Sequence, residues 1–179
     1  MSLPQQKFRE IVFQLLYSQD MARAADEDMI PLIMAELSVT KKAVKTALER
    51  VILVQAKERE IDKLIGEASL TYDFDRIPSV ERNILRLGVF ELLFDDEIPP
   101  KVAITEGMRL ARKFGSPEAA LFVNAILDNL YKNSLGEAID TKKFSESIQA
   151  LAVSEKITQE AVDALPASTD TSVEHVSGE

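Results

Sequence analysis

Residues 72–128 read YDFDRIPSVERNILRLGVFELLFDDEIPPKVAITEGMRLARKFGSPEAALFVNAILD, and this stretch decides the fold. Apolar residues recur in it at helical spacing, and proline interrupts the pattern three times. The pattern predicts three helices, at about 79–95, 100–114 and 117–133, after a short helical turn at 72–77. Ser79 is the expected cap of the first. Because that helix is apolar over most of its circumference, we expect it to be central and buried.

The flanking sequence also favours helices. We expect one at about 4–24, a short one through 30–37, and a long one that Thr40 caps and Gly66 ends. Strand signals are almost absent, since the sequence shows no sustained alternation and no Asn-Gly or Asp-Gly hairpin. Residues 141–153 and 155–165 predict short accessory helices, and the polar segment 166–179 is predicted to be disordered. The sequence therefore predicts an all-α fold with a C-terminal extension.

The composition is ordinary for a soluble globular protein and fits a reducing cytoplasm, where we expect the protein to be. It has 179 residues, a one-domain length, and no cysteine, so a disulfide framework is excluded. No apolar run approaches the length of a membrane span, and the N-terminus does not have the pattern of a signal peptide. The net charge is −9, but six acidic residues and one basic residue fall after position 153. A mildly acidic body can still present a basic face to phosphate.

The sequence does not favour catalysis. The one histidine, His175, lies in the predicted disordered tail, so no histidine-assisted nucleophile is expected. The six glycines are scattered and form no phosphate-binding loop. The run Asp95-Asp96-Glu97 could suggest a metal site, but a solvated helix end is the better interpretation. We expect no enzyme activity, no cofactor and no metal.

Three blocks in order, DRIPSVERNILRLGVFELL, IPPKVAITEGMRLARKFG and FVNAILD, resemble the NusB family of bacterial transcription antitermination factors. The resemblance extends back to REIVFQLLYSQD and covers about residues 5–135. It implies two packed helical bundles, a NusB-like fold. The expected organisation is an RNA-binding domain at 1–135 with subdomains at 4–68 and 72–134, an accessory extension at 136–165, and an acidic tail at 166–179.

The resemblance also implies RNA contacts at the start of the first helix. The family carries an arginine-rich motif there, at positions that match Gln5, Gln6, Lys7 and Arg9 in this chain. Each cation can contact phosphate, and each glutamine can hydrogen-bond a base or a sugar. From the residue types alone, a solvated first turn is the competing interpretation.

A second group of candidate RNA contacts comes from later helices. Arg109, Arg112 and Lys113 stand at helical spacing, with Lys101 two turns earlier. Taken alone, this pattern is typical of a solvated helix face. Phe122 matches a position that the family places beside the RNA path, so a base-stacking role is implied; its alternative role is core packing.

Tyr17 and Glu81 match positions that the family uses to dock the small-subunit ribosomal protein NusE. The implied function is antitermination: binding the boxA element of ribosomal RNA leaders with NusE and joining RNA polymerase with other Nus factors. The resemblance leaves a homodimer open. The alternatives are a protein-only adaptor and the NusB-like domain of an RNA cytosine methyltransferase. The methyltransferase reading requires a downstream α/β domain, which we do not find before Glu179.

Overall fold

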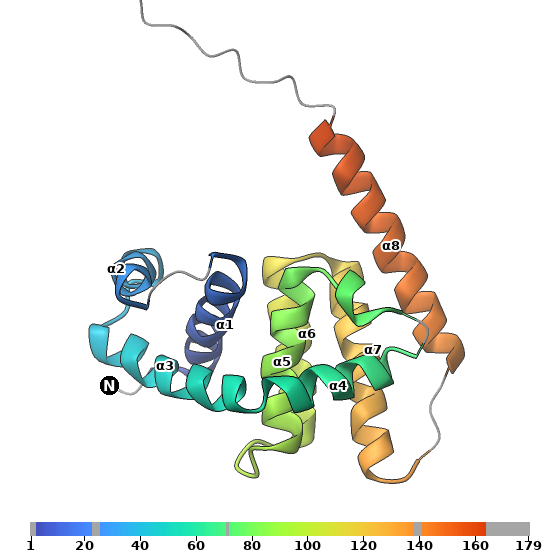
Figure 1. The fold of residues 1–179 in the computed structure, drawn as a ribbon, viewed down its shortest axis with the longest axis horizontal. Coiled ribbons are helices and arrows are strands. Elements are labelled where there is room, and N and C mark those ends of the chain that lie inside the picture. The colour runs from blue at the N-terminus through green and yellow to red at the C-terminus, as the bar shows by residue number, and fades with distance from the viewer. Residues whose placement is uncertain (1–2, 23–25, 71, 138–140, 164–179) are drawn as a thin grey trace, which may run out of the picture.

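The computed structural model describes residues 3–22, 26–70, 72–137 and 141–163. These residues form eight α-helices and one short 3₁₀ helix, with no strand among them (Figure 1). The elements are α1 (Gln5–Ala22), α2 (Asp26–Leu37), α3 (Lys41–Ala56), α4 (Glu58–Ala68), η1 (Phe74–Arg76), α5 (Ser79–Leu93), α6 (Pro100–Phe114), α7 (Pro117–Ser134) and α8 (Thr141–Asp163). The predicted disordered segment, with His175, lies outside the described residues. The all-α prediction is confirmed.

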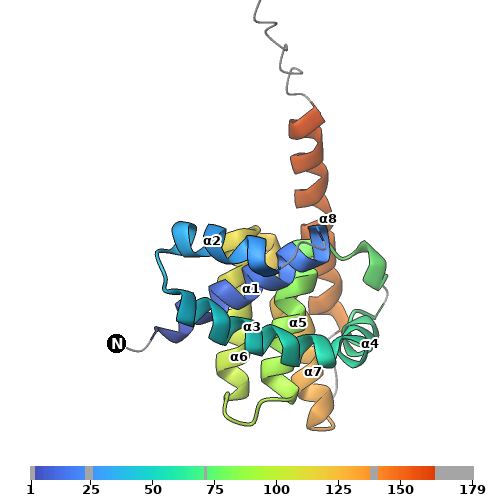
Figure 2. The ribbon, with the colours of Figure 1, turned by 60° about the vertical axis from the view of Figure 1, so that its left-hand side comes forward.

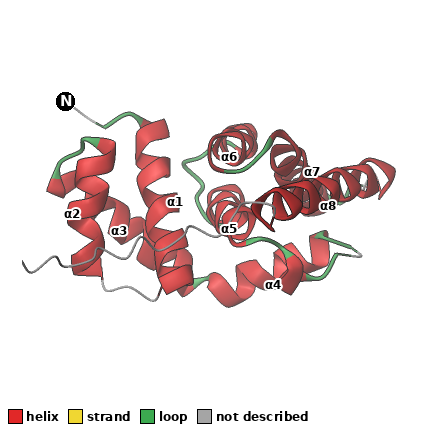
Figure 3. Cartoon of the chain, turned by 90° about the horizontal axis from the view of Figure 1, so that it is seen from above, coloured by secondary structure: helices red, strands yellow, loops and turns green. Residues whose placement is uncertain are grey.

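The helices fall into two groups that share a core. Seen from above, α1, α2 and α3 lie on one side and α5, α6 and α7 on the other, with α4 along one edge (Figure 3). Helix α1 packs against α2 and α3 within its own group and against α5 across the boundary. The buried apolar residues of both groups belong to one continuous cluster. The exact limits of the two predicted subdomains remain a prediction.

Helix α5 is the central element, because it packs against α1, α4, α6 and α7. Most of its side chains are buried, as its apolar circumference predicts. Most of its polar side chains are buried too, and most of these are paired: Arg86 binds Asp62 at 2.8 Å, and Asn83 donates to Asp20 at 2.9 Å. The predicted cap is wrong, because Ser79 is the first helical residue and makes no side-chain capping bond.

The single helix predicted after Thr40 is wrong in its length. Thr40 does cap α3, accepting a hydrogen bond from the backbone of Ala43. The helix ends at Lys57, whose backbone leaves the helical region (φ −107°, ψ 3°), and α4 resumes in a new direction. The apolar spacing continues through this bend and therefore conceals it. Gly66 does not end α4, which runs on to Ala68.

The C-terminal extension forms one helix, α8, over its described residues 141–163, and the predicted division into two short helices is wrong. The sequence has neither glycine nor proline between 141 and 163, so nothing interrupts the helical backbone. Helix α8 packs against α7 and buries Leu151, while its far end projects from the body (Figures 1 and 2). Val153 and Ile157 of α8 remain about 60% exposed.

Candidate nucleic-acid interface

The first turn of α1 carries three of the predicted RNA-binding residues at or near the surface. Gln5 and Gln6 are exposed, and Lys7 is partly exposed. The Gln6 amide lies 3.5 Å from a carboxylate oxygen of Glu106 on α6. Within the described part of the chain, Lys7 has no acidic partner. A polar turn with one unpaired cation can contact a nucleic-acid backbone.

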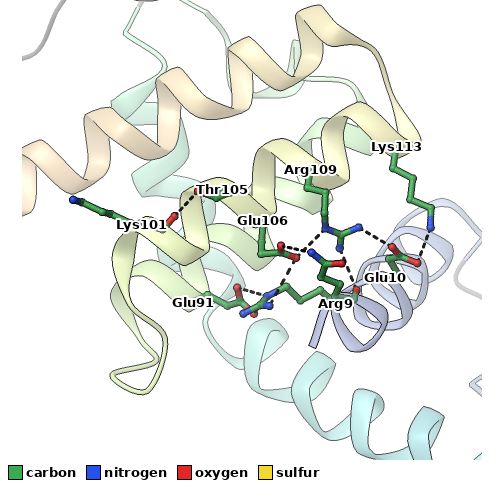
Figure 4. Close-up of polar contacts among 9 residues, drawn as sticks. Arg9, Glu10, Glu91, Lys101, Thr105, Glu106, Arg109 and Lys113 are labelled. Atoms are coloured by element: carbon green, nitrogen blue, oxygen red, sulfur yellow. Dashed lines mark hydrogen bonds and ion pairs between the residues drawn. The ribbon is translucent and has the colours of Figure 1, made fainter. Parts of the chain in front are cut away.

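Arg9, predicted to be an exposed RNA contact, is buried, with 4% of its surface accessible. Its Nε lies 2.9 Å from both carboxylate oxygens of Glu91 on α5, and its Nη1 lies 3.8 Å from Glu106 (Figure 4). The expected exposure is wrong, because position 9 lies on the same side of α1 as the core residues Val12 and Leu16. The sequence held one signal of this pairing, since Glu91 is a charged residue in an otherwise apolar helix.

Burial raises the pKa of Glu91, and the neighbouring Arg9 guanidinium opposes that rise. A buried charge is costly to leave unpaired, so the Arg9–Glu91 pair ties the start of α1 to the middle of α5. Arg9 therefore positions α1, and its guanidinium is not available to phosphate.

Glu10 is the centre of a second ion-pair group, which joins α1 to α6. Arg109 and Lys113 each approach a different oxygen of Glu10 at 2.7 Å, and Arg109 also contacts Glu106 at 3.0 Å (Figure 4). Burial opposes ionisation of Glu10, but the hydrogen bonds from Lys113 and Arg109 prevail and lower its pKa. The positive charges of both side chains are thus largely matched, although Lys113 stays half exposed.

The other two cations predicted on α6 are positioned differently. Arg112 is exposed and makes no ion pair with any described residue. Lys101 is also exposed, and its side chain points away from the ion pairs (Figure 4). Of the predicted basic group, Arg112 and Lys101 are therefore the cations available to phosphate, with Lys113 in part.

Phe122 is fully buried in the core, so the expected partly exposed aromatic is wrong. Its ring meets that of Tyr72 edge-on, with centroids 5.7 Å apart. Phe122 therefore packs in the core, which was the alternative role, and its ring has no accessible face on which a base could stack. No sequence signal separates an inward from an outward position on α7, because this helix is apolar on several sides.

The two predicted partner-docking residues line neighbouring pockets. Tyr17 is partly exposed and borders a hollow of about 340 Å³ with Phe114 and Val80. Val80 also borders a second pocket of about 770 Å³, where Glu81 faces α8. The two residues thus lie on adjoining parts of one surface, although Glu81 itself is only 6% exposed.

Burial raises the pKa of Glu81, and the nearby Glu155 of α8 raises it further. Burial also raises the pKa of Glu155. No cation pairs with Glu81 among the described residues, in contrast to Glu10 and Glu91. The C-terminal extension therefore brings a second carboxyl group to the predicted docking position.

Asp95 belongs to the acidic run 95–97 that was considered as a metal site. Its side chain pairs with Arg50 and accepts a hydrogen bond from the backbone N–H of Glu97. Within the described ranges, no three metal-ligating side chains gather at one point. Nor does any described helix combine the length and apolar character that crossing a membrane requires.

The family model of the NusB family matches residues 6–132, so the chain belongs to the NusB family. It is 40% identical over 131 residues to the transcription antitermination protein NusB of Chlamydia pneumoniae, covering 73% of this chain and 82% of that protein. The structure is similar to T. maritima NusB (TM-score 0.62, 32% identity, covering 81% of this chain and 99% of that one). It is also similar to a chain in the crystal structure of the antitermination factors NusB and NusE with dsRNA (TM-score 0.62, 29% identity, covering 72% and 96%).

Proposed function

We propose that this protein is a transcription antitermination factor. It binds the boxA element of ribosomal RNA leaders together with NusE and joins RNA polymerase with the other Nus factors in the bacterial cytoplasm. It catalyses no reaction. The observation that carries this proposal is membership of the NusB family over 6–132, supported by similarity to a solved NusB and NusE complex with RNA.

The RNA contacts in this proposal come from surface residues with unmatched charge or free polar groups. They are Gln5, Gln6, Lys7 and Arg112, with a partial contribution from the half-exposed Lys113. Arg9 and Phe122 have structural roles instead. So few free cations neutralise few phosphates, and for single-stranded RNA each adds only about 0.7 to the slope of log affinity against log salt. The protein alone should bind RNA weakly, and NusE should strengthen that binding.

NusE docks, in this proposal, at the adjoining pockets of Tyr17 and Glu81. A partly exposed tyrosine beside a hollow is a common anchor for a protein partner. Because binding of RNA and NusE is linked, each tightens the other by the same factor.

The protein-only adaptor remains the second candidate, and a specific observation favours it. Arg9 is buried, and Arg109 and Lys113 are matched by Glu10, so the accessible positive charge is smaller than the sequence indicates. In this alternative, NusE still docks at Tyr17 but RNA adds nothing.

A mobility-shift titration of boxA RNA, with and without NusE, separates the two candidates. The test variant is Lys7→Gln/Arg112→Gln, and the matched control is Arg59→Gln/Lys63→Gln on α4, which removes the same charge from another exposed surface. We expect weak binding alone, tighter binding with NusE, and a loss in the test variant only. If NusE binds but boxA RNA shifts no better than a scrambled RNA, the adaptor replaces the antitermination proposal.

The Tyr17→Ala variant tests the docking surface. It should weaken NusE binding in calorimetry while leaving RNA binding by the protein alone unchanged. A thermal melt confirms that it is folded. Unchanged NusE affinity would place the docking surface elsewhere.

A further inference from the structure

A groove separates the start of α1 from the start of α3, on the side of α1 opposite the Glu10 ion pairs. It encloses about 760 Å³, and its lining is more apolar than polar. Gln5 and Phe8 line it from α1, and Lys42, Thr46 and Arg50 line it from α3. Small-molecule sites in proteins occupy roughly 300–1,000 Å³, so this groove has room for one nucleotide.

Phe8 gives the groove an aromatic wall. The side chain packs partly against the core cluster and yet borders the groove, so its ring is fixed on one side and accessible on the other. Base–aromatic stacking requires that arrangement and tolerates any base. Gln5, exposed beside Phe8, can hydrogen-bond a base edge or a sugar.

The rim of the groove is positively charged. Lys42 lines the groove, and Lys41 and Lys45 lie next to it on α3; all three are exposed, and no described acidic side chain pairs with them. Arg50 also lines the groove but is already matched by Asp95. Glu49 is exposed one helical turn after Lys45, and no ion pair joins the two. In a chain of net charge −9, three unmatched lysines within five residues are a local exception.

The position of two of these lysines at a helix start lowers the stability of the helix. Lys41 and Lys42 occupy the first turn of α3, which has no acidic residue, and the positive end of the helix dipole repels cations there. A bound phosphate would be attracted both by the lysines and by the helix end. The groove therefore combines an aromatic wall with a polyanion-binding rim.

We propose that this groove holds one nucleotide of single-stranded RNA, with the base against Phe8 and the flanking phosphates on Lys42 and Lys45. This inference rests on the proposed RNA-binding function and adds a contact surface to it. Leu3, Pro4 and Gln5 line the groove, so it continues the surface of the first turn of α1. It supplies free cations beside a helix whose only arginine in its first two turns, Arg9, is buried.

The charge contribution is tested with Lys42→Gln/Lys45→Gln, titrated against a short single-stranded RNA containing boxA at several salt concentrations, with NusE present. The salt slope should fall by about 0.7 for each lysine that neutralises a phosphate. The control Arg59→Gln/Lys63→Gln removes equal charge from α4 and should leave the slope unchanged.

The aromatic contribution is tested with Phe8→Leu and Phe8→Tyr, both of which keep a large side chain in the core. Losing a stacked base should weaken RNA binding by roughly fivefold or more in Phe8→Leu, whereas Phe8→Tyr should retain binding. RNA carrying 5-iodouridine should form a photo-crosslink within the peptide that contains Phe8. Thermal melts establish that both variants are folded.

The outcomes separate this inference from the proposed function. If RNA binding depends on Lys7 and Arg112 but not on Lys42, Lys45 or Phe8, the groove assignment is wrong and the function stands. If the groove variants weaken NusE binding in the absence of RNA, the groove is a protein-docking site and the nucleotide assignment is overturned. If wild type binds no RNA even with NusE, both fail.

Discussion

The two sides of α1 differ in whether the nearby cations are paired with carboxylates. On the side that faces α5 and α6, three cations have acidic partners: Arg9 pairs with Glu91, and Arg109 and Lys113 pair with Glu10. On the side that faces α3, the lysines of the groove rim have none among the described residues. Matched charges fix the position of α1, whereas unmatched charges are free for a ligand. Counting cations along a helix does not separate these two uses.

The largest expected effect is at the Arg9–Glu91 pair, which tests whether the paired charges stabilise the fold. Arg9→Leu leaves Glu91 buried without its partner, and Glu91→Leu strands Arg9 in the same way. Each single change should lower the free energy of unfolding by about 3–5 kcal/mol, and the double change by much less. Urea denaturation of the four proteins measures this cycle. Single variants as stable as wild type would show that Arg9 is not a structural residue.

Glu10 connects the matched side to RNA binding. Glu10→Gln should cost about 1–2 kcal/mol of stability, because two charge-assisted hydrogen bonds weaken. The same change releases Arg109 and Lys113, so RNA binding should tighten and its salt slope should steepen. Urea denaturation measures the stability, and RNA titration measures the affinity. A variant in which stability and RNA affinity both fall, or both rise, would contradict this account.

The pH dependence of Glu10 and Glu81 should be opposite. The folded-state pKa of Glu10 is lowered, so its contribution is present at neutral pH and is lost as pH falls below the ordinary value of 4.5. The folded-state pKa of Glu81 is raised, so the charged form of this side chain destabilises the fold as pH rises above 4.5. Relative to wild type, Glu81→Gln should therefore gain stability at pH 7 and lose that advantage below pH 4.5. Denaturation at several pH values measures the difference, and a gain independent of pH would contradict the assigned cause.

The smallest expected effect is at Lys42, one of the unpaired lysines at the start of α3. Lys42→Glu places an acidic residue in the first turn of α3, which should raise stability by about 0.3–1 kcal/mol through the helix dipole. The same change should weaken RNA binding. A variant that is more stable yet binds RNA less well would indicate that Lys42 serves a ligand. Thermal melts and RNA titration provide the two readings, and a destabilised variant would refute the electrostatic argument.

The fold was largely predictable from sequence, because apolar periodicity and proline breaks reveal helices directly. The bend at Lys57 was not, since the apolar spacing continues across it and only the packing of α4 on α5 and α7 requires a turn. The continuity of α8 was missed although the lack of glycine and proline indicated it.

The candidate site was predictable only in part. The family resemblance together with residue type indicated Lys7 and Arg112 as possible contacts, but pairing depends on side chains far apart in sequence, such as Glu91 and Glu106 for Arg9. The burial of Phe122 likewise depends on Tyr72 and the surrounding helices. The groove at Phe8 and Lys42 exists only once α1 and α3 are placed together.

Lysine footprinting tests the central claim most directly, that unmatched cations bind RNA while matched ones hold the fold. The protein is acetylated with and without boxA RNA and NusE, and mass spectrometry reads the modification of each lysine. We predict that RNA protects Lys7, Lys42 and Lys45, whereas Lys57 and Lys63, paired with Glu60 and Glu67 on α4, react equally in both states. Equal reactivity of Lys7, Lys42 and Lys45 with RNA bound would contradict the account.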